Sequence, residues 1–171
     1  MDNLLLEIGA EEIPAGYIEP ALKAISTTLL QKMNQARVDC GNIKVYGTPR
    51  RLAVEVENVA ARQKSVKTEI TGPPSRVGFD ENGRPTIAAK KFAEKVKVPL
   101  SKITVKETKK GSYLCAKKTE KGISSRKLLS SILPEVILST PFPKTMRWAD
   151  LSIAFARPIH SIVALYGNKI I

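Results

Sequence analysis

In the first third of the chain the hydrophobic pattern changes from a helical period to a strand period. The apolar residues that recur at spacings of three and four are Leu22, Ile25, Leu29, Met33 and Ala36. This spacing predicts a helix that begins near Pro20 and turns one face toward a core. The period then becomes two, and Leu52, Val54 and Val56 alternate with alanine and glutamate. An amphipathic helix followed directly by strands restricts the chain to folds that pack helices on a sheet.

The rest of the chain continues this mixture of helices and strands. The further strands that the pattern predicts lie at 4–9, 43–45, 153–155 and 159–167, the last of them buried. The other predicted elements are a break at 71–75, a helix at 86–98, a hairpin at 103–118 with its turn at 109–112, a helix at 124–139 that Pro134 kinks or divides, and a loop at 141–148.

We therefore expect an α+β fold, with mixed or antiparallel sheets and a few packed helices in two small subdomains. An N-terminal α/β unit is expected at 1–61 and a basic helix-plus-hairpin subdomain at 62–122. A helix-and-strand segment at 123–171 is expected to return to the core. It stops as a strand begins to return after Gly167, which is typical of a chain truncated at its carboxyl end.

Positive charge is concentrated in the middle of the chain. Residues 1–61 carry 6 Lys/Arg and 8 Asp/Glu, residues 62–127 carry 18 and 6, and residues 128–171 carry 4 and 2. The net charges of these parts are −2, +12 and +2. A polyanion such as RNA is one expected partner of the middle part. A lysine-rich surface that only keeps the protein soluble is the alternative.

Several classes of protein are excluded by motifs that the sequence lacks. It has no apolar run of about 18 residues, so no membrane span is expected, and no signal peptide opens it, which predicts a cytoplasmic location. Cys40 and Cys115 are distant from each other, and His160 has no cysteine near it, so no metal site is expected. We predict a structural role for His160 in a buried strand, and no catalytic residue, because no nucleophile or base has a partner nearby.

Cationic side chains recur where the chain turns and in the basic middle part, and these form the predicted RNA-binding site. The candidate residues are Arg50, Arg51, Lys90, Lys91, Lys144, Arg147, Trp148 and Arg157. A guanidinium group donates two parallel hydrogen bonds to one phosphate, and an indole ring stacks on a base. The alternative is that the four arginines pair with the acids of residues 2–19, while Trp148 fills the core.

Seven segments in order resemble the amino-terminal part of the beta subunit of bacterial heterotetrameric glycyl-tRNA synthetases. They are LLLEIGAEEIPA (4–15), YGTPRRLAV (46–54), TGPP (71–74), FDENGRPTIAAKKFA (79–93), KGSYL (110–114), LLSSILPEVI (128–137) and FPKTMRWAD with FARPIHSIVALYG (142–167). The chain departs from the family pattern at Ala149, where glycine is usual, and at Ser161, where an aromatic residue is common.

The resemblance implies an ATP- and Mg²⁺-dependent ligase that joins glycine to its tRNA and contains two alpha and two beta subunits. In such enzymes the alpha subunit holds the class II catalytic domain, and the beta subunit binds tRNA. The expected partners are glycine tRNA, the alpha subunit and the remainder of the beta subunit. This piece would bind no cofactor and would be inactive alone. The alternative is a scaffold module that contacts the other parts of the enzyme without touching RNA.

Overall fold

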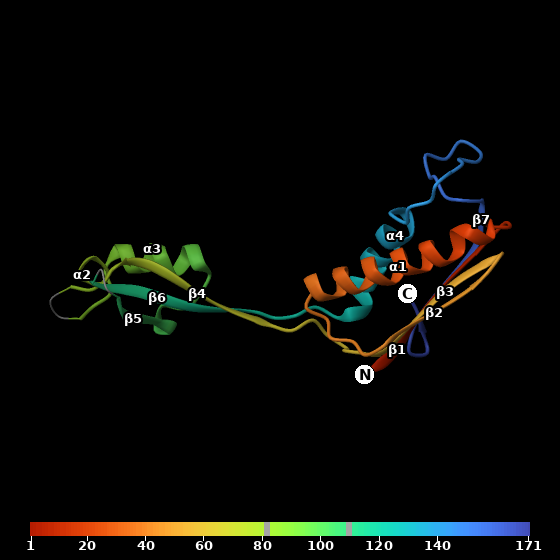
Figure 1. Ribbon diagram of the computed structural model, residues 1–171. Helices are drawn as coiled ribbons and strands as arrows, with labels where there is room; N and C mark the ends of the chain where they lie inside the picture. Colours follow the sequence, from red (N-terminus) through yellow and green to blue (C-terminus); the bar gives the residue numbers. More distant parts are fainter. Residues whose placement is uncertain (81–82, 109–110) are drawn as a thin grey trace. The chain divides into compact units, whose positions relative to one another are not determined.

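The chain folds into two compact units with an antiparallel sheet in each. The residues that the computed structural model describes are 1–80, 83–108 and 111–171. Unit 1 contains residues 1–64 and 123–171, and unit 2 contains residues 65–122 (Figure 1). Every strand pairing in both sheets is antiparallel, and helices pack beside the strands. The predicted α+β fold is confirmed.

The sheet of unit 1 has the first strand of the chain at its centre. Its strands are β1 (Asp2–Ala10), β2 (Ile43–Thr48), β3 (Arg51–Val59), β7 (Ile159–Tyr166) and β8 (Lys169–Ile170). Their order across the sheet is β2-β3-β1-β7-β8. Leu6 of β1 lies between Val54 of β3 and Ala164 of β7. The two ends of the sequence therefore form one sheet, and unit 2 is inserted between them.

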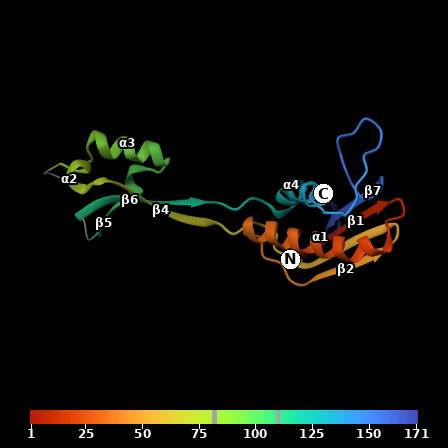
Figure 2. The same ribbon diagram turned by 45° about the horizontal axis from the view of Figure 1, so that its top comes forward.

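Two helices, α1 (Ala15–Gln35) and α4 (Ser125–Leu138), pack against each other on one face of this sheet (Figures 1 and 2). The buried residues that the two central strands turn toward the helices are Leu4, Leu6, Ile8, Leu52, Val54 and Val56. The helix stripe predicted from the sequence is confirmed, because Leu22, Ile25, Leu29 and Met33 are all buried. Each such side chain contributes roughly 1.5–3 kcal/mol when it leaves water.

Both helices of unit 1 contain a proline. The predicted helix start near Pro20 and the predicted division at Pro134 were wrong, while a kink at Pro134 stays a prediction. Helix α1 begins at Ala15, well before Pro20, because Tyr17 and Ile18 also pack against the core. Helix α4 continues through Pro134 as one element, and buried side chains flank the proline on both sides. In each case the apolar surface that is buried outweighs the backbone hydrogen bond that proline removes.

Two predictions for the carboxyl-terminal part were also wrong. Strand β7 is largely exposed, with 52% of Ile162 and 40% of Val163 accessible. Only the short β8 lies beyond β7 in the sheet. Helix α1 contacts β2 and β3, which lie toward the opposite edge of the sheet. No strand forms at 153–155, where Phe155 makes a single antiparallel bridge to Met146 instead.

Unit 2 is a smaller sheet with one helix packed on it. Its elements are β4 (Val66–Pro74), α2 (Ser75–Gly78), α3 (Ile87–Val96), the 3₁₀ turn η1 (Leu100–Lys102), β5 (Ile103–Thr108) and β6 (Gly111–Glu120). The order of the strands is β4-β6-β5. The buried residues of its core cluster are Ala89, Phe92, Val96, Leu114 and Ala116. The predicted helix and hairpin are confirmed, while Lys109 and Lys110 of the predicted turn lie outside the described residues.

Strand β4 was missed, because the sequence predicts a break at 71–75. The structure continues the strand to Pro74, with a shift of register between Thr71 and Pro74. Prolines are tolerated here because β4 is an edge strand, unpaired on one side, and because the register shift interrupts its ladder with β6 at this point. Gly72 is required by packing, because a Cβ atom there would lie 2.7 Å from the ring of Phe92. This close approach seats α3 directly on β4.

Among the helices of the described residues, none combines the length and the apolar character needed to cross a membrane.

Candidate nucleic-acid interface

Two of the predicted cationic segments of unit 1 meet at the end of β1. The amide of Ala10 donates a hydrogen bond to the carbonyl of Arg50 at 3.0 Å. The next amide, that of Glu11, donates to the carbonyl of Pro158, also at 3.0 Å. The turn before β3 and the segment before β7 are therefore fixed on either side of one acidic stretch, although they are far apart in sequence.

The side chains at this point form a β1-end cluster of Glu7, Glu11, Glu12, Arg50, Arg51, Arg157 and His160. Its polar contacts are Arg51–Glu7 at 3.6 Å, Arg50–Glu12 at 3.9 Å, the Arg157 Nε bond to the Glu12 carbonyl at 2.9 Å, and His160 Nε2 to Glu11 Oε1 at 3.0 Å. The prediction of a buried His160 was wrong, because the ring is exposed beside a carboxylate. Exposed ion pairs contribute between 0 and about 1 kcal/mol, so these arginines remain accessible to other anions.

The third predicted segment of unit 1, the loop at 141–148, contains exposed cationic side chains and a half-buried tryptophan. Lys144 and Arg147 are exposed and make no ion pair within the described part of the chain. Trp148 is half-buried and packs against the core. It lines an apolar cavity of about 470 Å³ together with Leu138 and Ile162. The loop therefore presents cations to solvent, while its indole faces a hollow beside α4 and β7.

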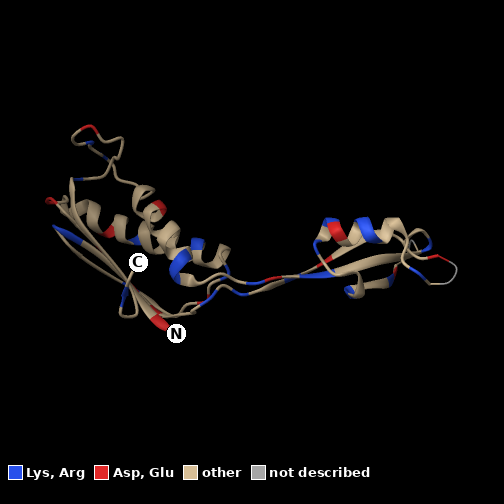
Figure 3. Ribbon diagram, turned by 180° about the vertical axis from the view of Figure 1, so that it is seen from behind, with Lys and Arg blue, Asp and Glu red and all other residues tan. Residues whose placement is uncertain are grey.

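The two predicted lysines of unit 2 belong to a larger set on α3. Lys90 and Lys91 lie on the outer side of the helix, and the inner side is buried against the sheet. Lys95 and Lys97 extend the same outer surface and were not among the predicted site residues. The signal that could have found them is the spacing of Ala89 and Val96, three and four residues from Phe92. This apolar spacing marks the buried face of the helix and leaves the lysines on the outer side. Figure 3 shows the charged bands along α3.

Unit 2 carries 14 Lys/Arg and 6 Asp/Glu, a net charge of +8. Part of this charge is neutralised on the sheet. Lys106 pairs with Glu69 at 2.9 Å, and Lys118 pairs with Glu120 at 3.3 Å. Among the described residues, the four lysines of α3 have no such ion pair. The outer surface of α3 and its C-cap therefore gathers four lysines without an ion pair, together with one acid, Glu94.

The Lys106–Glu69 pair predicts a pH dependence of stability. The hydrogen bond that Lys106 donates lowers the pKa of Glu69 below its ordinary value. The folded state therefore binds this proton less tightly than the unfolded state, and the pair stabilises unit 2 at neutral pH. That contribution is lost as the pH falls below the ordinary range of a glutamate and through the lowered pKa of Glu69. Melting temperatures of the wild type and Glu69→Gln should differ at pH 7 and converge at pH 3; a difference independent of pH would contradict this.

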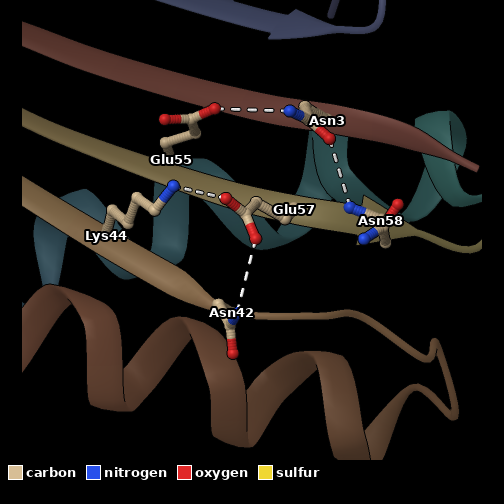
Figure 4. Close-up of polar contacts among 6 residues, drawn as sticks. All are labelled: Asn3, Asn42, Lys44, Glu55, Glu57 and Asn58. Atoms are coloured by element: carbon tan, nitrogen blue, oxygen red, sulfur yellow. Dashed lines mark hydrogen bonds and ion pairs between the residues drawn. The ribbon is translucent and has the colours of Figure 1, made fainter.

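The open face of the unit 1 sheet carries a polar network that is internally satisfied (Figure 4). Lys44 donates to Glu57, which raises the pKa of Lys44 and lowers that of Glu57. Asn42 also donates to Glu57 at 3.5 Å. Asn3 donates to Glu55 at 3.3 Å. Since this network holds one cation, Lys44, and two carboxylates, Glu55 and Glu57, this face is a poorer site for a polyanion than α3.

Groups able to perform catalysis are sparse in the part of the chain that the structure describes. No cluster of three or more His, Cys, Asp or Glu side chains there is arranged to hold a metal ion. Both cysteines are free thiols. Burial, with a smaller effect from Asp39, raises the pKa of Cys40, which disfavours the reactive thiolate. The arrangement is suited to binding anions.

Comparison with known proteins identifies the family. The family model described as glycyl-tRNA synthetase beta subunit matches residues 4–171. The glycine–tRNA ligase beta subunit of Desulfatibacillum aliphaticivorans is 53% identical over the whole chain, and that of Desulforapulum autotrophicum is 48% identical over the whole chain. The corresponding protein of Syntrophus aciditrophicus is 44% identical over 99% of the chain. The chain spans about a quarter of the length of each of these relatives. With a match along almost all of its residues, the chain belongs to the glycyl-tRNA synthetase beta subunit family.

Proposed function

We propose that this chain is a non-catalytic, RNA-binding part of a glycine–tRNA ligase beta subunit. In the complete cytoplasmic enzyme, with two alpha and two beta subunits, it contributes to binding glycine tRNA and to assembly. ATP and Mg²⁺ are used by the class II catalytic domain of the alpha subunit. The names of the relatives support the ligase assignment. The observation that supports RNA contact is the uncompensated positive charge on the outer surface of α3.

Binding of this kind works through phosphates. Each lysine or arginine that neutralises a phosphate releases a condensed counterion, so affinity falls steeply as salt rises. Such contacts hold the RNA without reading its sequence, which is the task of base contacts. The chain would therefore position tRNA for the ligase, and discrimination of glycine tRNA from others would rest mainly on other contacts.

A salt titration of tRNA binding tests this proposal. The chain is titrated with glycine tRNA and with an unrelated tRNA between 50 and 200 mM salt. We expect the logarithm of the binding constant to fall linearly with the logarithm of salt, by roughly 0.7–0.9 per neutralised phosphate. Four phosphate contacts would weaken binding roughly 50- to 150-fold over this range. Absence of binding to either tRNA at 50 mM salt would refute RNA contact.

A scaffold role is the second candidate, and the apolar surface of unit 1 favours it. Leu138, Leu151 and Ile162 are each about half exposed around the cavity that Trp148 lines. An apolar interface with the alpha subunit or the rest of the beta subunit would be insensitive to salt, unlike a phosphate interface. Binding to the alpha subunit that persists from 50 to 500 mM salt, without tRNA binding, would favour this function.

A further inference from the structure

Helix α3 is a ridge with lysines on both of its sides. Its buried residues Ala89, Phe92, Ala93 and Val96 fix which side faces the sheet. With 3.6 residues per turn, Lys90 then lies on one flank, and Lys91 and Lys95 lie on the other. Lys97, the C-cap residue with a left-handed backbone, lines the same hollow as Lys90 and so belongs to that flank. Glu94 and Ile87 lie between them on the crest, and 72% of Ile87 is exposed. We call this surface the α3 ridge, defined by Lys90, Lys91, Glu94, Lys95 and Lys97.

Shallow, open hollows lie along both sides of the helix. The hollow on one flank is lined by Lys90, Glu94 and Lys97, among others, and measures about 390 Å³, so the acid of the crest also borders this flank. The hollow on the other flank is lined by Lys91, Lys95 and residues of β4, and also measures about 390 Å³. The contact between Gly72 and the ring of Phe92 holds the helix in place. The two pairs of lysines are thus held apart by a firmly seated helix.

We propose that the α3 ridge lies in the minor groove of double-helical RNA, an inference that rests on the proposed RNA-binding function. The minor groove of an A-form helix is wide and shallow, and a phosphate strand borders it on each side. A ridge with cations on both flanks matches two parallel rows of phosphates. Lys90 and Lys97 would neutralise one strand, and Lys91 and Lys95 the other. None of these lysines has an ion pair within the described residues that would compete with binding to a phosphate.

Glu94, the acid on the crest, distinguishes the minor groove of RNA from other polyanions. Glu94 lies between four lysines, where it lowers the attraction for any polyanion that remains at a distance. At the floor of an RNA minor groove, however, its carboxylate meets hydrogen-bond donors, namely ribose 2′-hydroxyls and the amino group of guanine. The groove of B-form DNA lacks the 2′-hydroxyl and is about 6 Å wide, too narrow for a helix about 10 Å across. The ridge therefore favours RNA duplexes over DNA duplexes.

The ridge also differs from a site for single strands. Proteins that bind single strands combine a cationic groove with aromatic side chains on which bases stack. The crest residues of α3 are Ile87 and Glu94, neither of which offers a π-face. A convex surface with a central acid is suited to a groove that two strands enclose.

Two double variants test whether both flanks contact RNA. Lys90→Gln with Lys97→Gln, and Lys91→Gln with Lys95→Gln, each remove two charges and keep the apolar stem of the side chain. The probe is a perfect RNA duplex of about 20 base pairs. Each double variant should reduce the salt slope by about 1.5–2 and weaken binding at 50 mM salt by about tenfold. The matched control is Lys67→Gln with Lys117→Gln on the opposite face of the same sheet, which should change binding less than twofold.

A substitution at the crest separates groove binding from simple attraction, because the two predict opposite signs. Glu94→Ala should weaken binding of the RNA duplex about tenfold if the carboxylate accepts a hydrogen bond in the groove. If lysines only attract the polyanion, loss of a negative charge should tighten binding. The same RNA strand without its complement, and a DNA duplex of the same sequence, should bind the wild type more weakly than the RNA duplex does.

The outcomes distinguish this inference from the function on which it rests. If the wild type binds neither tRNA nor the RNA duplex, the proposed function itself fails. If it binds RNA but the flank variants behave like the control, if only one flank matters, or if Glu94→Ala tightens binding, the ridge proposal is overturned while RNA binding stands. Weakening by both flank variants and by Glu94→Ala supports it.

Discussion

Phe155→Ala is expected to lower the free energy of unfolding of unit 1 by about 3–5 kcal/mol. The ring is 1% exposed and lies edge-on to Phe142, with centroids 4.7 Å apart. Its removal leaves a cavity and also takes away the contact that holds Phe142. The backbone bridge between Phe155 and Met146 anchors the loop that carries Lys144 and Arg147. This variant should therefore loosen the loop as well as the core.

Denaturant unfolding followed by fluorescence would measure this effect. Trp148 is the only tryptophan of the chain and lies in unit 1, so its emission reports on that unit. The matched control is Leu151→Ala, since this residue of the same loop is 47% exposed. Its cost should stay below about 1 kcal/mol. Equal losses for the two variants would show that Phe155 does not support the core.

Leu114→Ala is expected to cost unit 2 about 2–5 kcal/mol. This side chain is fully buried in a described cluster of five buried residues, so one truncation removes a large part of the core. It also packs closely on Gly78, where a Cβ atom would lie 2.4 Å from Leu114 Cδ1. Because the same cluster supports α3, loss of Leu114 should also weaken RNA binding through the α3 ridge.

Hydrogen exchange of the amides of β4, β5 and β6 would measure the stability of unit 2 directly. Val105→Ala is the matched control, because Val105 pairs with Leu114 across the hairpin but is 49% exposed. It should cost less than about 1 kcal/mol. If both variants lose protection equally, the hairpin rather than the buried cluster determines the stability of the unit.

The candidate site could be predicted only in part from the sequence. Lys90 and Lys91 were named from their motif, whereas the role of Lys95 and Lys97 depends on which side of α3 is buried. The sequence offered, as an alternative, that the four arginines pair with the acids of residues 2–19. The structure agrees for Arg50 and Arg51, which pair with Glu12 and Glu7, because sheet order brings their turn to the end of β1. RNA contact by any of the eight predicted residues stays a prediction.

The sequence alone determined the features that depend on local periodicity. The stripe on α1, the alternation in β3 and the hairpin of β5 and β6 follow from side chains that are close in sequence, and the structure contains all three. The α+β class and the concentration of positive charge also follow directly from residue types and their order.

The tertiary structure decided every feature that depends on a distant neighbour. Pro73 and Pro74 stand in a strand because β4 is at an edge and shifts register there. Helix α1 extends back beyond Pro20 because the partly buried Tyr17 packs against the core. The apolar β7 stays exposed because little covers that side of the sheet. Burial and strand pairing depend on which surfaces meet in space, and local sequence carries little information about such contacts.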